Sequence, residues 1–143
     1  RRIMSELRPF HLAFPVTCLT QASAFYGELL GCQKGRESNQ WIDWNFFGHQ
    51  VVTHLVAKMP SAPAYNAVDN HAVPVPHFGV VLTLSDWRKL ADKLIAANIE
   101  FVVEPYTRCK GQVGEQSTLF LLDPFGNALE FKAFADLSAL FAK

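Results

Sequence analysis

Apolar residues recur in this chain with two different periods, and the two periods alternate along it. Short apolar runs rich in aromatic and β-branched residues predict strands over residues 9–16 and 77–84. Each run is followed by a segment in which large apolar residues recur at helical spacing, such as Leu90 with Leu94 in the second segment. The pattern therefore predicts a strand followed by a helix, twice.

Polar and glycine positions indicate where these elements begin and end. Thr20 and Ser85 are suited to cap the two helices, and Gly31 is suited to end the first one. Three more strands are expected after each helix, separated by turn residues such as Gly48 and Gly126. These strands are expected at residues 32–36, 41–46 and 50–57 in the first half, and at residues 101–104, 117–122 and 128–134 in the second half.

The two halves repeat one pattern at a nearly constant spacing. His77 follows His11 by 66 residues, and the second helix start follows the first by 65 residues. Gly126 follows Gly48 by 78 residues, so the second half holds about a dozen extra residues. A loop over residues 105–116, which contains two glycines, is the natural place for them. The sequence therefore predicts two tandem βαβββ units.

Such a repeat belongs to the α+β class, with each helix covering one face of a curved sheet. A chain of 143 residues is expected to form a single domain, residues 1–143. The two repeats are expected at about residues 9–57 and 77–134. A linker over residues 58–76, with four prolines, is expected to connect them as a loop.

The composition excludes several classes of function. Lys plus Arg and Asp plus Glu number 13 each, so the chain has no net positive charge that would favour binding to nucleic acid or to an anionic membrane. No apolar run approaches the length of about 18 residues that a membrane span needs. The three cysteines form no CxxC pair and no disulfide framework, which is typical of a cytoplasmic protein. We therefore expect a cytoplasmic protein that binds neither nucleic acid nor a membrane.

The stretch DPFGNALEF, residues 123–131, places one carboxylate in an apolar strand. Asp, Pro, Gly and Asn make the first five residues a tight turn. In the strand that follows, successive side chains point to opposite faces. Ala128, Glu130 and Lys132 then share one face, and the apolar residues Leu129, Phe131 and Ala133 share the other. Glu130 is therefore expected either at a surface or bound to a partner.

Two histidines are the expected partners of Glu130. His11 and His77 open the first strands of the two repeats, so the repeat symmetry would bring them together in a cleft with Glu130. Two imidazoles and one carboxylate form a facial triad, which suits Fe(II) and leaves coordination positions open for substrate. Each residue alone is more often an ordinary strand residue, but the joint occurrence of two histidines at equivalent repeat starts and a carboxylate at a repeat end favours a metal site.

Several segments resemble the vicinal oxygen chelate superfamily, which includes glyoxalase I, bleomycin- and fosfomycin-resistance proteins and extradiol dioxygenases. The resemblance spans about residues 9–134 and is strongest in PFHLAFPV, FYGELLG, PHFGVVL and FLLDPFGNALEF. The stretches WIDWNFFGHQVVTHL and GEQSTLFLLDPFGNALEFKAF resemble small proteins described as extradiol dioxygenases. The resemblance implies metal-ligand roles for His11, His77 and Glu130.

One position departs from the pattern of this superfamily. Glyoxalase I-like members carry a fourth, carboxylate ligand at the strand position that we match to His54. We expect three ligands, with His54 as an acid–base group beside the metal, because a histidine can titrate near neutral pH. Direct ligation by His54 is the alternative. In the extra loop of the second half, Tyr106 and Arg108 are expected to orient a phenolate or carboxylate of the substrate.

The leading hypothesis for the function is extradiol cleavage of a catechol-like aromatic by Fe(II), or Mn, and O₂. A second hypothesis is a glyoxalase- or epimerase-like enzyme that uses Ni, Zn or Mn without O₂, which a ligand role for His54 would favour. A third is a metal-free binding protein of the drug-resistance type. The resemblance is also compatible with a homodimer, since short two-unit proteins of this kind often pair.

Overall fold

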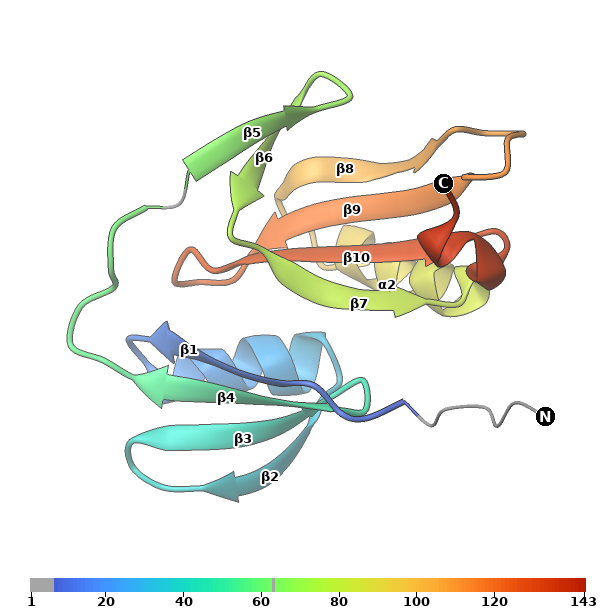
Figure 1. Ribbon diagram of the computed structural model, residues 1–143. Helices are drawn as coiled ribbons and strands as arrows, with labels where there is room; N and C mark the ends of the chain where they lie inside the picture. The colour runs from blue at the N-terminus through green and yellow to red at the C-terminus, as the bar shows by residue number, and fades with distance from the viewer. Residues whose placement is uncertain (1–6, 63) are drawn as a thin grey trace. The chain divides into compact units, whose positions relative to one another are not determined.

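A computed structural model describes residues 7–62 and 64–143 and divides the chain into two compact units (Figure 1). The first unit spans residues 1–59 and the second spans residues 60–143. Each unit contains its own four-stranded sheet and its own long helical segment.

The first unit follows the predicted order of elements. Its sheet has the strand order β1-β4-β3-β2, in which β1 and β4 are parallel and the other neighbours are antiparallel. The helix lies between the first two strands in sequence. The elements are β1 (His11–Val16), α1 (Leu19–Ala22), the π-helical η1 (Ser23–Leu29), β2 (Gln33–Glu37), β3 (Trp41–Phe46) and β4 (His49–Leu55).

The second unit repeats this topology after an additional hairpin. Its sheet has the order β7-β10-β9-β8, and β7 and β10 form the parallel pair. This order is identical to that of the first unit, which confirms the predicted tandem βαβββ units and the α+β class. The elements are β5 (Ala64–Val68), β6 (His71–Val75), β7 (Phe78–Leu82), α2 (Leu84–Ala96), β8 (Phe101–Arg108), β9 (Gln116–Leu122), β10 (Ala128–Phe134) and the 3₁₀-helical η2 (Leu137–Phe141).

The apolar face of each sheet packs against the helix of its own unit. In the second unit, α2 lies along one face of the sheet (Figure 1), and Trp87 of α2 donates a hydrogen bond from Nε1 to the backbone oxygen of Phe131 in β10. Phe131 and Leu129 are fully buried on this face. In the first unit, Trp44 of β3 donates from Nε1 to Oγ1 of Thr53, which satisfies two buried polar groups. The opposite face of each sheet is therefore free to carry polar side chains.

The predicted linker is not wholly a loop, and this part of the prediction is wrong. Residues 64–75 form the antiparallel hairpin β5–β6, which turns at Asp69 and Asn70. Both turn residues have positive φ, as tight hairpin turns require. Every residue of β5 is exposed, so the strand lacks the alternation of buried and exposed residues that would have indicated it.

The helices begin earlier than the sequence predicted. Cys18, not Thr20, is the N-cap residue of α1, and Thr83, not Ser85, caps α2 by accepting a hydrogen bond from the backbone N–H of Asp86. Hydroxyl residues stand on both sides of the second boundary, so the sequence alone could not fix it. No helix within residues 7–62 and 64–143 is long and apolar enough to cross a membrane.

The second strand of the second βαβββ repeat, β8, is longer than predicted. Residues 105–108 were expected to be loop, but β8 continues to Arg108. The strand bulges twice against β9, and Tyr106 then pairs with Thr118. This extension places Tyr106 and Arg108 on the edge strand of the sheet and not in a loop.

Candidate metal and substrate site

A small pocket lies within the second unit, on the face of the sheet that α2 leaves free. Its volume is about 210 Å³. The hairpin β5–β6 contributes one wall, and β8, β9 and β10 contribute the others. The lining residues are Val68, His71, Val73, His77, Val103, Tyr106, Arg108, Thr118, Phe120, Glu130 and Lys132. Four of the six site residues predicted from the sequence therefore line one pocket.

The alternation of side chains along β10 aims Glu130 into this pocket. Glu130 is 14% exposed at its side chain, while its neighbours Leu129 and Phe131 are 0% exposed on the opposite face. The backbone of Glu130 lies against Gly79 of β7 at very short range. A Cβ atom at Gly79 would lie 1.5 Å from the Glu130 carbonyl oxygen. A residue without a side chain is therefore required beside Glu130.

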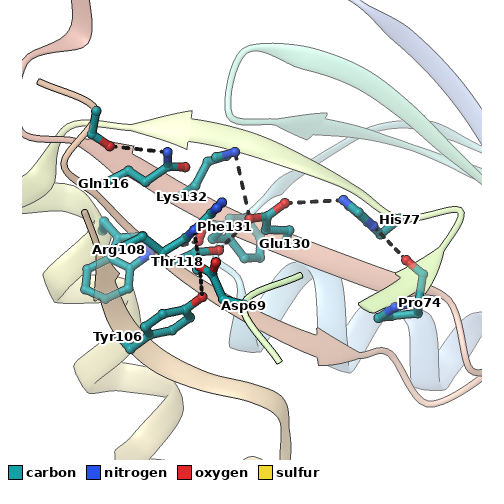
Figure 2. A network of polar contacts seen from close by, with 12 residues as sticks. Asp69, Pro74, His77, Tyr106, Arg108, Gln116, Thr118, Glu130, Phe131 and Lys132 are labelled. Atoms are coloured by element: carbon teal, nitrogen blue, oxygen red, sulfur yellow. Dashed lines mark hydrogen bonds and ion pairs between the residues drawn. The ribbon is translucent and has the colours of Figure 1, made fainter. Parts of the chain in front are cut away.

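His77 stands directly before β7 and faces Glu130 (Figure 2). Its Nδ1 lies 2.7 Å from the carbonyl oxygen of Pro74, which can only accept a hydrogen bond, so Nδ1 carries the proton. In the neutral ring, Nε2 is then a bare lone pair 3.3 Å from Oε1 of Glu130. A lone pair and a carboxylate oxygen repel each other unless a cation lies between them. The pair is therefore stabilised when a proton or a metal ion lies between the two atoms.

A divalent metal fits these two atoms. At metal–ligand distances of about 2.0–2.2 Å, two ligand atoms lie about 3.0 Å apart at a right angle and about 3.4 Å apart at the tetrahedral angle. The 3.3 Å between Nε2 of His77 and Oε1 of Glu130 falls between these values. A hydrogen bond from the other ring nitrogen to a backbone oxygen is also the usual way to orient a metal-binding histidine.

The second unit supplies two of the expected ligands, not a complete set. Within residues 7–62 and 64–143, no three His, Cys, Asp or Glu side chains are grouped so that they could hold a metal ion. His77 and Glu130 are brought together, whereas His11 and His54 belong to the first unit.

Two further side chains hold the Glu130 carboxylate. Thr118 of β9 donates a hydrogen bond of 2.5 Å from Oγ1 to Oε2 of Glu130. Lys132, two residues along β10, places Nζ 4.0 Å from the same oxygen. Both contacts engage Oε2, so Oε1 is left facing His77 (Figure 2).

Tyr106 and Arg108 meet the carboxylate of Asp69 from the hairpin turn. Tyr106 donates from its hydroxyl to Oδ2 of Asp69 at 3.1 Å, and Nε of Arg108 lies 2.5 Å from the same oxygen. Burial raises the pKa of Tyr106 above its usual value, and the hydrogen bond and negative charge of Asp69 raise it further. Tyr106 is therefore held as a neutral hydrogen-bond donor.

In the first unit, His11 is oriented in the same way as His77. Its Nδ1 lies 2.8 Å from Oε1 of Gln50, so an Nδ1–H bond to this oxygen leaves Nε2 as the lone pair. His54 is exposed on β4, opposite Trp41 of β3. His11 faces Gln50 across the parallel pair β1–β4, and His54 stands four residues further along β4.

The strand register corrects the position that we assigned to His54. Across the parallel pair of the second unit, Glu130 faces Gly79, two residues after His77. In the first unit, Ala13 lies two residues after His11, and it faces Val52 across the parallel pair. The repeat equivalent of Glu130 is therefore the apolar Val52. His54 lies two residues further along β4, on the same face of the sheet. The acid–base role of His54 stays a prediction.

Sequence reasoning missed four residues that line the pocket or contact its lining residues. Asp69 and His71 lie at the tip of the hairpin that was expected to be a loop, and His71 packs its ring 5.2 Å from that of Tyr106. Thr118 gave no signal of its own, because only the pairing of β9 with β10 brings it to Glu130. Lys132 could have been found, since it was expected on the same strand face as Glu130.

Known structures resemble this fold over nearly the whole chain. A glyoxalase/bleomycin resistance protein/dioxygenase from Alicyclobacillus acidocaldarius is 31% identical, with a TM-score of 0.75 over 94% of this chain and 96% of that one. A glyoxalase/dioxygenase from Nostoc punctiforme is 14% identical, with a TM-score of 0.67 over 94% and 100% of the two chains. The fosfomycin resistance protein FosX from Listeria monocytogenes is 14% identical, with a TM-score of 0.65 over 92% and 94%. The last two show the fold alone.

The family is also indicated by the sequence itself. No curated protein matches the chain at a significant level. Residues 8–131 match the family described as the Glyoxalase/Bleomycin resistance protein/Dioxygenase superfamily, which is most of the 143 residues. The chain belongs to this superfamily, the vicinal oxygen chelate group.

Proposed function

We propose that this protein is a metal-dependent enzyme that cleaves a small catechol-like aromatic in the extradiol manner, with Fe(II) and O₂. The observation that carries the proposal is the His77–Glu130 pair, 3.3 Å apart and opening onto a pocket with an apolar wall. Val73, Val103 and Phe120 form that wall. A pocket of about 210 Å³ is smaller than most drug-binding pockets, so it suits a single ring.

The residues of the chain have separate tasks in this proposal. When bound, the iron would supply a Lewis-acid centre at which the two vicinal oxygens of the substrate and O₂ are held together. Glu130 contributes one negative charge, which leaves a bound dication strongly acidic. Thr118 and the backbone oxygen of Pro74 fix the directions of Glu130 and His77. The apolar wall orients the flat face of the ring and excludes water.

The strand register favours this function over a glyoxalase- or epimerase-like one. A set of four protein ligands would need a donor at the repeat equivalent of Glu130, and Val52 occupies that position. Fewer protein ligands leave more coordination positions for a chelating substrate and O₂. The ligand role of His11 and the acid–base role of His54 stay predictions from the sequence.

Metal analysis of the purified protein tests the metal site first. Glu130→Gln and His77→Ala should each lose bound metal while keeping the circular dichroism of the wild type, because Leu129 and Phe131 pack through the other face. Glu104→Gln, which removes an exposed carboxylate of β8, is the matched control and should keep the metal. Equal, negligible metal in all four proteins would indicate a metal-free binding protein.

Oxygen uptake tests the reaction. The protein is reconstituted anaerobically with Fe(II), and O₂ consumption is then measured with a panel of catechols. The expected result is uptake with a ring-opened, yellow product that His11→Ala abolishes. His54→Gln should shift the pH profile of kcat rather than the metal content. Tight Zn or Ni binding without O₂ consumption would contradict the dioxygenase and favour the lyase or isomerase class. Light scattering of the same preparation tests the expected homodimer.

A further inference from the structure

The turn of the β5–β6 hairpin carries a carboxylate to the wall of the pocket. Asp69 and Asn70 both have positive φ, with values of 49° and 66°, which closes the hairpin tightly. A single oxygen of Asp69, Oδ2, then contacts the hydroxyl of Tyr106 and Nε of Arg108. The hairpin thus presents the chain's own carboxylate to two donors of β8.

These donors are suited to an oxyanion of a ligand. Arg guanidinium groups bind carboxylates and phosphates strongly, and a phenol adds a neutral donor. The side chain of Asp69 is 46% exposed, more than the 28% of Arg108. An ion pair with so exposed a partner contributes little to stability, at most about 1 kcal/mol. An oxyanion that enters the pocket can therefore replace Asp69 at modest cost.

A third donor, Lys132, lies in line with Tyr106 across the sheet. Lys132 of β10 pairs with Thr118 of β9, which pairs with Tyr106 of β8. These three residues therefore form a row on one face of the sheet, and all three line the pocket. The Nζ atom of Lys132 lies 4.0 Å from Oε2 of Glu130, which is the upper limit of distance for an ion pair.

The charges of the pocket also favour an anionic ligand. Arg108 and Lys132 are cancelled by Glu130 and Asp69, so the four formal charges sum to zero. A divalent ion bound at Glu130 would leave two uncompensated positive charges in a pocket of about 210 Å³. Positive charge concentrated in a small concave site attracts anions from solution.

We propose that Arg108, Tyr106 and Lys132 form an oxyanion subsite that Asp69 occupies until a ligand replaces it. The substrate would then carry a carboxylate or phosphate group in addition to its two vicinal oxygens. This statement about the substrate rests on the proposed function, whereas the subsite itself does not require the metal. Asp69 is a specificity-determining residue here, because a ligand without the oxyanion leaves it in place.

Calorimetric titration of the metal-free protein with benzoate and with inorganic phosphate tests the subsite alone. Arg108→Gln should weaken binding about tenfold to a hundredfold, since hydrogen bonds to charged groups contribute about 1.5–3 kcal/mol. Arg88→Gln, at an exposed arginine of α2, is the matched control and should leave binding unchanged. Preference for benzoate or for phosphate identifies the oxyanion class. Equal binding by Arg108→Gln and Arg88→Gln would overturn the proposal.

The Asp69→Asn variant tests whether the Asp69 carboxylate competes with the ligand or only holds the hairpin against β8. If Asp69 competes with the ligand, Asp69→Asn should tighten benzoate or phosphate binding by up to about fivefold. Glu104→Gln removes the same charge from an exposed position of β8 and should have a much smaller effect. If Asp69 only fastens the hairpin, Asp69→Asn leaves binding unchanged or weakens it, and the competition is refuted.

Turnover with iron separates this inference from the proposed function. A dihydroxybenzoate should have a higher kcat/KM than catechol, and Arg108→Gln should abolish the difference. If neither compound is turned over but benzoate still binds through Arg108, the proposed function fails and the subsite stands. If both are turned over equally by the wild type and by Arg108→Gln, the subsite fails and the proposed function stands.

Discussion

Replacement of Gly79 by alanine tests how closely β7 and β10 approach at the candidate site. The added Cβ would lie 1.5 Å from the carbonyl oxygen of Glu130 and 2.7 Å from its carbonyl carbon. Both atoms belong to the backbone, so no side chain can rotate away. An ordinary contact needs at least 3.4 Å, and the strands must therefore separate by about 2 Å. Separation on this scale breaks hydrogen bonds of the β7–β10 ladder, each of which contributes about 1 kcal/mol.

The expected loss of stability follows from these two effects. Overpacking commonly costs about 1–3 kcal/mol, and two ladder hydrogen bonds add about 2 kcal/mol, so Gly79→Ala should cost about 3–5 kcal/mol. At about 3 °C for each kcal/mol, Tm should fall by about 9–15 °C. Denaturant unfolding followed by circular dichroism measures the free energy directly.

Gly35 of β2 provides a matched control for this substitution. A Cβ at Gly35 would lie 3.4 Å from its nearest neighbour, the Cβ of Asp43, which is an ordinary contact. Gly35→Ala should therefore be neutral or slightly stabilising, because alanine restricts the unfolded chain more than glycine does. Equal stability of the Gly79→Ala and Gly35→Ala proteins would refute the close approach of β7 to Glu130.

Three further substitutions test individual contacts. Thr118→Val removes the hydrogen bond to Glu130 and should weaken metal binding about tenfold to a hundredfold, measured by competition with a chelator. Asp69→Asn should lower the pKa of Tyr106, measured by ultraviolet absorbance of the phenolate. Because the pKa of Tyr106 is raised in the folded state, the wild type loses stability as the pH rises from about 10 through the pKa of the folded protein. The Asp69→Asn protein should lose less stability over the same pH range. Asp123→Ala removes a buried carboxylate that accepts three hydrogen bonds within its turn, and should destabilise the protein by about 2–4 kcal/mol in urea unfolding.

Periodicity alone predicted much of the fold because burial is periodic in these elements. The alternation along residues 128–134 placed Glu130 and Lys132 on one face of β10, and the structure confirms it. The turn before this strand was also predictable, since Asp123 accepts hydrogen bonds from Phe125 and Asn127 and Gly126 has a φ of 91°. The hairpin β5–β6 was not predictable, because its outer strand is exposed along its whole length.

The sequence by itself determined the tandem βαβββ units and the residues suited to bind a metal, because both follow from local patterns and residue chemistry. Only the tertiary structure decided which side chains meet. Pairing of β10 with β7 and β9 brings His77 and Thr118 to Glu130. A hairpin turn brings Asp69 to Arg108. Such contacts depend on strand register and on pairing between distant segments, and no local pattern encodes either. A shift of one residue in register would turn every side chain of a strand to the opposite face.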